Sequence, residues 1–124
     1  MPYPDDRKYT KDHEWIRLSG DSAEIGITDY AQQQLGDVVY VELPEIGATV
    51  SPGQAFGSIE SVKAVSELFA PVGGTVTDVN AGLKTHPEAI NSDPHGTWMI
   101  KVQVAKPADP ASLLDTAQYQ SLLG

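Results

Sequence analysis

The chain has 124 residues and no cysteine, so it can bury one core without disulfides and offers neither a thiolate metal site nor a cysteine nucleophile. Its formal net charge of −9 comes from 17 acidic and 8 basic residues, which argues against a nucleic-acid binder because such proteins need a basic face toward the phosphates. An acidic surface instead suits attraction to basic protein partners.

The N-terminal segment 1–8 has neither the apolar core of a secretory signal nor the Arg-rich amphipathic pattern of a transit peptide. No apolar run elsewhere in the chain approaches the length of a membrane span. We therefore expect a cytoplasmic protein of bacterial type, folded as one domain over residues 1–124, with no membrane contact.

The first third of the chain is predicted to form strands around one short helix. Thr28 is a suitable N-cap for a helix over residues 29–35, and Gly36 suits the position just after it. Apolar and polar residues alternate in the runs before the helix, and a Val-rich run follows it. The strands expected here are 13–18, 23–27 and 37–43.

Two strand-like runs flank a tight reversal at the centre. Residues 55–62 lead into it and residues 64–70 lead out, with Lys63 between them. A turn over residues 71–74 then opens a further strand over 75–79. The pattern predicts a central hairpin with a lysine at its tip.

The C-terminal third begins with a polar stretch over residues 80–91, in which we expect one or two helical turns. Alternation predicts a strand over 98–104, with Trp98 facing the core and Met99 facing outward. The tail is predicted to be helical, with Asp109 as N-cap, Pro110 at the first helical position and a capping box from Asp115 to Gln118. The apolar face expected for this helix is Leu114, Ala117, Gln118 and Leu122.

A short internal repeat bears on the architecture. Segments 47–50 and 73–76 are similar, and each follows a Pro-containing turn and opens a strand, which fits two similar halves joined at the central hairpin. Many short strands separated by turns indicate a β-barrel or a β-sandwich.

Lys63 is the residue on which the chemical interpretation depends. Asn-Gly or Asp-Gly is the usual choice for a two-residue hairpin loop, but this chain has Val62 and Lys63 there. A lysine at an exposed turn is accessible to a modifying enzyme, and acylation would remove its charge. The alternative is an ordinary solvated lysine on a surface hairpin.

The segment around this lysine resembles the lipoyl-attachment motif of glycine cleavage H proteins. Its members are Glu60, Ser61, Val62, Lys63 and Ala64. Six further collinear segments resemble that family, so the resemblance covers nearly the whole chain: 9–15, 26–32, 35–39, 41–44, 70–72 and 98–101. The chain departs from the family pattern at Glu67, where many members have aspartate, and at Gly73, where serine is common.

The resemblance implies a mainly β fold, the lipoyl-domain-like hammerhead or barrel-sandwich hybrid. Such a fold has two antiparallel sheets, a short internal helix, a C-terminal helix and the modified lysine at a hairpin tip. It also implies lipoate joined by an amide to Lys63, placed there by a lipoate-attaching enzyme.

The implied function is that of a non-catalytic, monomeric carrier. In this family the carrier takes the aminomethyl group of glycine from glycine decarboxylase (P protein) to aminomethyltransferase (T protein). Dihydrolipoyl dehydrogenase (L protein) then reoxidises it. The absence of cysteine agrees with this role, because a free thiol could exchange with the lipoyl disulfide.

A carrier of a group that water can release should shelter it in a cleft. The cargo amine is cationic, so a carboxylate should lie beside it. The resemblance implicates Glu14 in such a cleft, and Glu67 is a second candidate because it lies four residues beyond the lysine. Each could instead be an ordinary exposed carboxylate on a strand.

Other residue groups predict less. His13, His86 and His95 lack metal-ligand spacing, so we expect no metal site. Glu60 and Glu67 could be read as the paired carboxylates of a hydrolase, but such a pair must face across a pocket. Beside a hairpin tip they fit better as an acidic rim for a partner or for the lipoylating enzyme. Trp15 and Trp98 are most simply core residues.

Rival carriers fit the motif less well. Biotinyl domains usually present Met-Lys-Met and the lipoyl domains of 2-oxo acid dehydrogenases usually Asp-Lys-Ala, whereas this chain has Val62, Lys63 and Ala64. Two alternatives remain open, namely an H-like protein that relays lipoyl groups to other enzymes and an unmodified binding module on the same fold.

Overall fold

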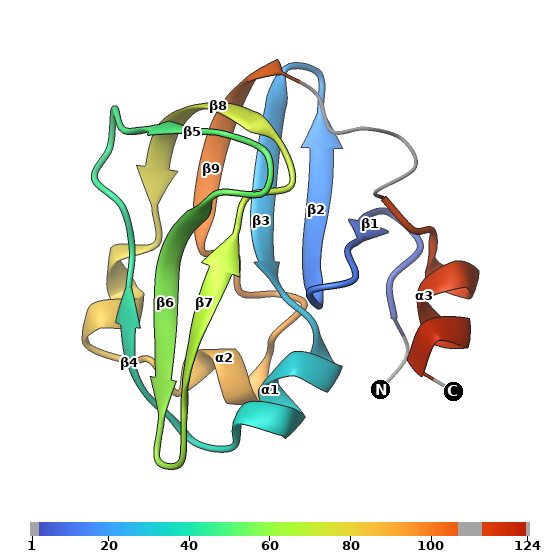
Figure 1. Cartoon of the computed structure of the whole chain (residues 1–124). Helices are drawn as coiled ribbons and strands as arrows, with labels where there is room; N and C mark the ends of the chain where they lie inside the picture. The colour runs from blue at the N-terminus through green and yellow to red at the C-terminus, as the bar shows by residue number, and fades with distance from the viewer. Residues whose placement is uncertain (1–2, 107–112, 124) are drawn as a thin grey trace.

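The computed structural model describes residues 3–106 and 113–123. Two antiparallel sheets pack face to face (Figure 1). The larger sheet has the strand order β1-β2-β3-β9-β8-β5, and the smaller has the order β4-β6-β7. The mainly β fold with two antiparallel sheets, a short internal helix and a C-terminal helix is confirmed.

The bounds of the elements are as follows. The strands of the larger sheet are β1 (Lys8–Tyr9), β2 (Glu14–Ser19), β3 (Ser22–Ile27), β5 (Thr49–Val50), β8 (Gly73–Val79) and β9 (Ile100–Lys106). The strands of the smaller sheet are β4 (Val38–Glu42), β6 (Ala55–Ser61) and β7 (Val65–Phe69). The helices are α1 (Asp29–Leu35), the 3-10 helix η1 (Ala81–Lys84), α2 (Ala89–Ser92) and α3 (Thr116–Leu123).

Helix α1 forms where its caps predict it. The Thr28 hydroxyl accepts a hydrogen bond from the backbone N–H of Ala31 at 3.2 Å. Gly36 ends the helix with φ = 78°, a conformation that glycine adopts without strain, and its N–H donates to the Gln32 carbonyl. The helix lies at the open lower end of the two sheets, beside the β6–β7 hairpin (Figure 1).

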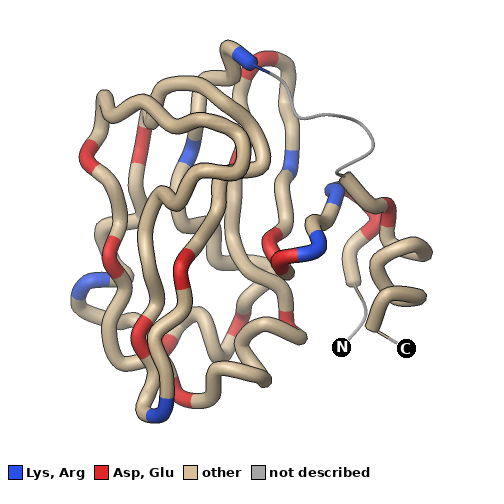
Figure 2. Tube along the Cα trace, viewed as in Figure 1, with Lys and Arg blue, Asp and Glu red and all other residues tan. Residues whose placement is uncertain are grey.

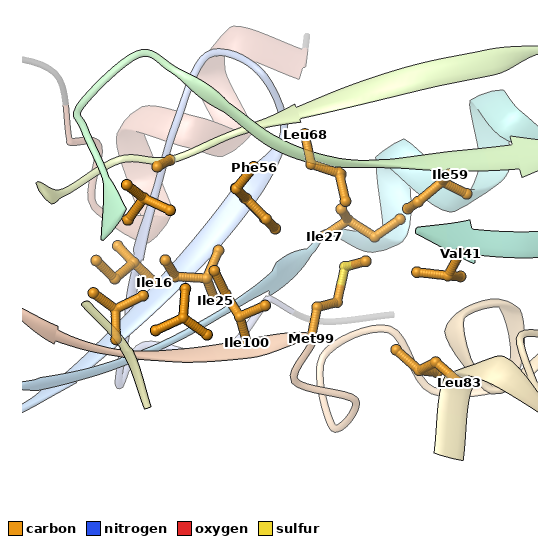
Figure 3. Packing of buried hydrophobic residues seen from close by; sticks show 14 of the residues in the cluster. Ile16, Ile25, Ile27, Val41, Phe56, Ile59, Leu68, Leu83, Met99 and Ile100 are labelled. Atoms are coloured by element: carbon orange, nitrogen blue, oxygen red, sulfur yellow. The ribbon is translucent and has the colours of Figure 1, made fainter. Parts of the chain in front are cut away.

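The main core fills the space between the sheets. Ile25 and Ile100 from the larger sheet face Ile59 and Leu68 from the smaller, and all four are buried (Figure 3). A separate aromatic cluster, made of Tyr9, Trp15 and Tyr119, holds α3 against β1. The fold therefore has one central core and a second small core under its C-terminal helix.

A glycine in β3 makes room for the second core. Trp15 and Gly26 are direct partners across β2 and β3. A Cβ atom built at Gly26 would lie 2.6 Å from the Trp15 ring, far inside van der Waals contact. The indole is 1% exposed and donates to the Pro94 carbonyl, so it is fixed in place.

The internal repeat forms one strand pair. Segment 47–50 contains β5 and segment 73–76 opens β8, with Thr49 opposite Thr75 and Val50 opposite Gly74. The two similar segments are thus antiparallel neighbours in the larger sheet.

Two details of the predicted last strand are wrong. The strand begins at Ile100, not at Trp98. Met99 is fully buried, although alternation would place it outward, because its side chain turns into the core at the end of the sheets (Figure 3). Trp98 is half-buried and packs against the aromatic cluster. The helical turns expected within residues 80–91 are η1 and the start of α2.

The C-terminal helix is confirmed, but its bounds and buried face differ from the prediction. The capping box is present, since the N–H of Gln118 donates to Asp115 Oδ1 at 2.8 Å and the N–H of Asp115 donates to Gln118 Oε1 at 2.9 Å. The expected N-cap at Asp109 and first helical position at Pro110 lie outside the described residues.

Leu114 does not belong to the helix. Its backbone forms a bridge with Tyr9, with two hydrogen bonds of 2.7 and 2.8 Å. Tyr119 carries the buried face, whereas Ala117, Gln118 and Leu122 are exposed. The prediction failed because the helix packs on Tyr9 through the ring of Tyr119. The spacing of aliphatic residues, on which the prediction was based, does not indicate such a contact. Among the described helices, none is both long and apolar enough to cross a membrane.

Candidate functional site

Lys63 is exposed and lies in the loop between β6 and β7, and Figure 2 shows a basic position at the tip of this hairpin. Ser61 closes the loop. Its N–H donates to the Ala64 carbonyl at 2.8 Å, and its hydroxyl oxygen accepts from the backbone N–H groups of Ala64 at 3.1 Å and Lys63 at 3.3 Å. One serine side chain thus supports a two-residue loop that lacks the usual Asn-Gly.

The tip is tied to the segment that follows α1. The N–H of Val62 donates to the Asp37 carbonyl at 3.0 Å. The stem of Lys63 runs beside Gly36, so that a Cβ at that glycine would lie 3.5 Å from Lys63 Cε. Asn91 from α2 braces the same place by donating to the Gly36 carbonyl at 2.9 Å. The lysine is therefore exposed but stands on a fixed base.

A cavity of about 330 Å³ opens directly beside the loop. It lies between the turn that precedes β2, helix α1 and strand β7, and we call it the cleft. Its first residue on the hairpin side is Ala64, which follows Lys63 in the chain. The residues that line the cleft are 12–14, Ile27, Ala31, Gln34, Leu35 and 64–68.

Glu14 lies in this cleft and is only 2% exposed. Its carboxyl accepts hydrogen bonds from the Thr10 hydroxyl at 3.0 Å and from the N–H of Phe69 at 3.2 Å. Burial raises the pKa of Glu14 to about 8. Within the described residues, Glu14 takes part in none of the ion pairs. The carboxyl is thus a buried acid that a visiting cation would ionise.

Glu67 and Glu60 have different surroundings. Glu67 lines the same cleft from β7, is exposed and stands opposite Ser58 in the hairpin. Glu60 is exposed and does not line the cleft. The two carboxylates do not face each other across this cavity, so the arrangement of a paired-carboxylate hydrolase is not present there.

The three histidines lie in three separate environments. His86 is exposed beside Glu88, at 3.2 Å. His95 is buried, and its Nε2 accepts from the N–H of Asp29 at 3.1 Å. His13 lines the cleft. Among the described residues, no three His, Asp or Glu side chains are placed to hold a metal ion.

Sequence reasoning missed several contributors to this site. Thr10 and the backbone of Phe69 hold the Glu14 carboxyl, and Asn91 braces the base of the hairpin. Thr10 and Glu14 are four residues apart on either side of a turn, and this spacing could have predicted the contact between them from the sequence. Asn91 gave no such indication, because its partners lie about 55 positions away in the chain.

Comparison with known proteins gives a consistent result. The chain matches the family described as "Glycine cleavage H-protein" over residues 7–124. It is 58% identical over 120 residues to the glycine cleavage system H protein of Koribacter versatilis (strain Ellin345), which covers 97% of this chain and 93% of that protein. It is 50% identical over 124 residues to the protein of the same name from Geobacillus kaustophilus (strain HTA426), which covers 99% of this chain and 98% of that protein.

A solved structure agrees over the whole length. The crystal structure of a glycine cleavage system H protein from Mycobacterium marinum superposes with a TM-score of 0.91 at 41% identity, covering 98% of this chain and 99% of that chain. At this TM-score and coverage, the two chains have the same overall fold.

Proposed function

The chain belongs to the glycine cleavage H-protein family and is a lipoyl carrier of glycine cleavage, and we propose that Lys63 is the residue that carries the group. The observation that carries this proposal is the position of Lys63. Its side chain is exposed at a hairpin tip, and the next residue in the chain, Ala64, lines the cleft. An amine in such a place can be acylated and can still reach the cavity beside it.

The cleft suits a lipoyl chain. Its walls include the side chains of Ile27, Ala31, Leu35 and Leu68, which offer apolar contact to an aliphatic acyl arm. When bound, lipoate supplies a disulfide that can be opened and closed again. The residues of this chain then provide a surface on which the arm rests and from which water is excluded.

Glu14 is proposed to receive the cationic amine of the aminomethyl cargo. Its carboxyl is buried, lacks a cationic partner among the described residues and has a pKa raised to about 8 by burial. An ammonium group that enters the cleft would favour the ionised carboxylate, so the proton leaves Glu14 as the cargo arrives. Glu67, at the exposed side of the same cleft, is proposed as a weaker contact to the amine.

The surroundings of the tip are proposed to serve partner docking. The exposed carboxylates Asp37, Glu60 and Glu67 lie on the two segments next to the lysine, namely the segment that follows α1 and the β6–β7 hairpin, and Figure 2 shows acidic positions along both. The exposed Val62 and Val65 add apolar surface. Such a surface suits enzymes with a basic rim around an apolar patch. The proposed visitors are the P, T and L proteins and the lipoate-attaching enzyme, with the chain acting as a non-catalytic monomer over residues 1–124 in the bacterial cytoplasm.

Intact mass tests the attachment residue. We expect lipoylation of the wild-type chain, after co-expression with a lipoate-attaching enzyme, to add one lipoyl group, and Lys63→Arg to abolish the addition. Lys84→Arg, which changes an exposed lysine on η1, is the matched control and should be modified like the wild type. Modification that persists in Lys63→Arg would overturn the assignment.

The role is tested separately by glycine decarboxylation. The lipoylated wild-type chain, mixed with P protein and glycine, should support glycine-dependent exchange of carbon dioxide. The Lys63→Arg variant should not. A modified chain that fails to support exchange would contradict the carrier role while leaving the attachment site intact.

A further inference from the structure

One buried hydroxyl joins two of the three walls of the cleft. The first wall is the turn from Thr10 to Glu14, and the second is α1, whose N-cap is Thr28. Tyr119 comes from α3 and is fully buried outside the cleft lining. Its hydroxyl lies 2.8 Å from His13 Nδ1 in the first wall and 2.7 Å from Thr28 Oγ1 in the second.

His13 is the part of the first wall that needs support. Its φ of 67° lies in the left-handed region, which few residues other than glycine adopt. The ring is packed between Tyr30, at 4.6 Å, and Tyr119, at 5.7 Å between centroids. The Tyr119 hydroxyl supplies the hydrogen bond that fixes the ring's orientation.

His13 and Glu14 move together because the turn is closed by its own hydrogen bonds. The N–H of His13 donates to the Thr10 carbonyl at 3.1 Å, and the N–H of Thr10 donates to the Glu14 carbonyl at 2.9 Å. The Thr10 hydroxyl also holds the Glu14 carboxyl. A displacement of His13 is therefore transmitted to the carboxyl.

The second wall is fixed by the same hydroxyl. Thr28 Oγ1 accepts from the N–H of Ala31, a residue that lines the cleft, and the N–H of Thr28 donates to the His13 carbonyl at 3.0 Å. The first turn of α1 and the turn that carries Glu14 thus meet at Tyr119.

We propose that Tyr119 is a positioning residue of the carrier, whose hydroxyl sets the spacing between the Glu14 wall and the α1 wall and so keeps water away from the Glu14 carboxyl. This inference rests on the proposed function of the cleft as a cargo shelter. It makes α3, which packs against β1, part of the working site.

The test compares two tyrosines of one aromatic cluster. Tyr119→Phe removes the bridging hydroxyl and leaves the ring in place. Tyr9→Phe is the matched control, because Tyr9 is also fully buried, stacks on Tyr119 at 4.8 Å between centroids and donates to the Pro4 carbonyl, away from the cleft. Thermal unfolding of both variants measures the loss of stability that each substitution causes, so that this loss can be separated from an effect on the cleft.

The first readout uses the unmodified full-length chain and needs no cargo. The pKa of the Glu14 carboxyl is followed by carbon NMR. We expect Tyr119→Phe to lower it by about half a unit or more, since a loosened cleft admits water to the carboxyl, and Tyr9→Phe to leave it unchanged. An unchanged value in Tyr119→Phe, or an equal fall in Tyr9→Phe, would overturn the proposal.

The second readout is the lifetime of the loaded, lipoylated chain. We expect Tyr119→Phe to release its aminomethyl group at least about threefold faster than the wild type, and Tyr9→Phe to behave as the wild type. Combined with Glu14→Gln, Tyr119→Phe should add no further loss, because both act on one contact. Additive losses, or a wild-type lifetime in Tyr119→Phe, refute the positioning role. A wild-type chain that takes no cargo instead refutes the proposed function.

If Tyr119→Phe proves too unstable to handle, His13→Gly replaces it. Glycine accepts the left-handed backbone without strain, so this variant removes the imidazole from the bridge while relieving the turn. The same fall in the Glu14 pKa is expected. A pKa that stays at the wild-type value would count against the bridge.

Discussion

The carboxyl of Glu14, in the first strand pair of the larger sheet, accepts a hydrogen bond from the backbone N–H of Phe69 in the smaller sheet at 3.2 Å. This contact joins the two sheets at the inner end of the cleft. It also places a buried acid at the end of the strand that leads away from Lys63. Because this hydrogen bond joins the two sheets, the protonation state of Glu14 bears on how they are held together.

Stability should fall as pH rises through the range in which Glu14 ionises. The pKa of Glu14 is about 8 in the folded protein, against 4.5 for the ordinary carboxyl, so the folded state binds one more proton than the unfolded state between these values. The free energy of unfolding therefore decreases with rising pH, by roughly 1.4 kcal/mol per unit at most, and levels off above the folded pKa.

Urea unfolding at a series of pH values, with Glu14→Gln beside the wild type, measures this effect. The amide can still accept from Phe69 N–H and donate to Thr10, so the variant should fold and lack the Glu14 component of the slope. Equal slopes in the two proteins would show that Glu14 does not titrate in this range.

Loss of the Glu14 carboxyl should shorten the life of the loaded carrier without affecting its modification. Glu14→Ala removes the only nearly buried carboxyl of the cleft, so release of the aminomethyl group should be faster, while lipoylation at Lys63 continues. Glu67→Ala should have a smaller effect, because that side chain is exposed. Formaldehyde and ammonia release report the lifetime, and equal lifetimes in all three proteins would remove Glu14 from the site.

Ser61→Ala should loosen the lysine loop. The substitution removes the hydroxyl that accepts from the N–H groups of Lys63 and Ala64, at a cost of about 0.5–1.5 kcal/mol. Hydrogen exchange at these two amides should accelerate, and lipoylation of Lys63 should slow. Ser51→Ala, at an exposed position outside the lining of the cleft, is the control and should change neither. Protected amides in Ser61→Ala would contradict the support that we assign to this serine.

Asn91→Ala should weaken the base on which the hairpin stands. It leaves the N–H of Val38 and the carbonyl of Gly36 without their partners at 2.8 and 2.9 Å, which should destabilise the protein by about 1–3 kcal/mol. Asn91→Asp keeps the acceptor for Val38 and should recover part of the loss. Denaturant midpoints of the two variants check the order, and an aspartate variant no more stable than the alanine variant would argue against this bracing.

Gly26→Ala tests the packing of the second core. The new methyl would lie 2.6 Å from the Trp15 ring, so the indole must move, and we expect a loss of about 1–3 kcal/mol with a changed tryptophan emission. Gly82→Ala is the control, because its nearest neighbour is a side-chain atom at 3.5 Å. Comparable midpoints for the two variants would mean that Trp15 has room to adjust.

The sequence by itself determined the local features of this protein. Caps such as Thr28 and Gly36, the capping box at Asp115 and the alternating strands follow from contacts within a few residues, and each was predictable. The central hairpin with Lys63 at its tip was predictable for the same reason, since strands and turns are signalled by neighbouring residues. Collinear motifs also identified the family, which the comparisons confirm.

Only the tertiary structure decided what surrounds these features. The burial of Glu14 depends on Phe69, 55 positions away, and the orientation of His13 depends on Tyr119, 106 positions away. Met99 and Tyr119 are buried because the ends of the sheets and the edge strand β1 offer them space, which no periodicity within their own segments records. Side-chain burial and pKa are properties of distant neighbours, so they are settled only when the chain brings those neighbours together.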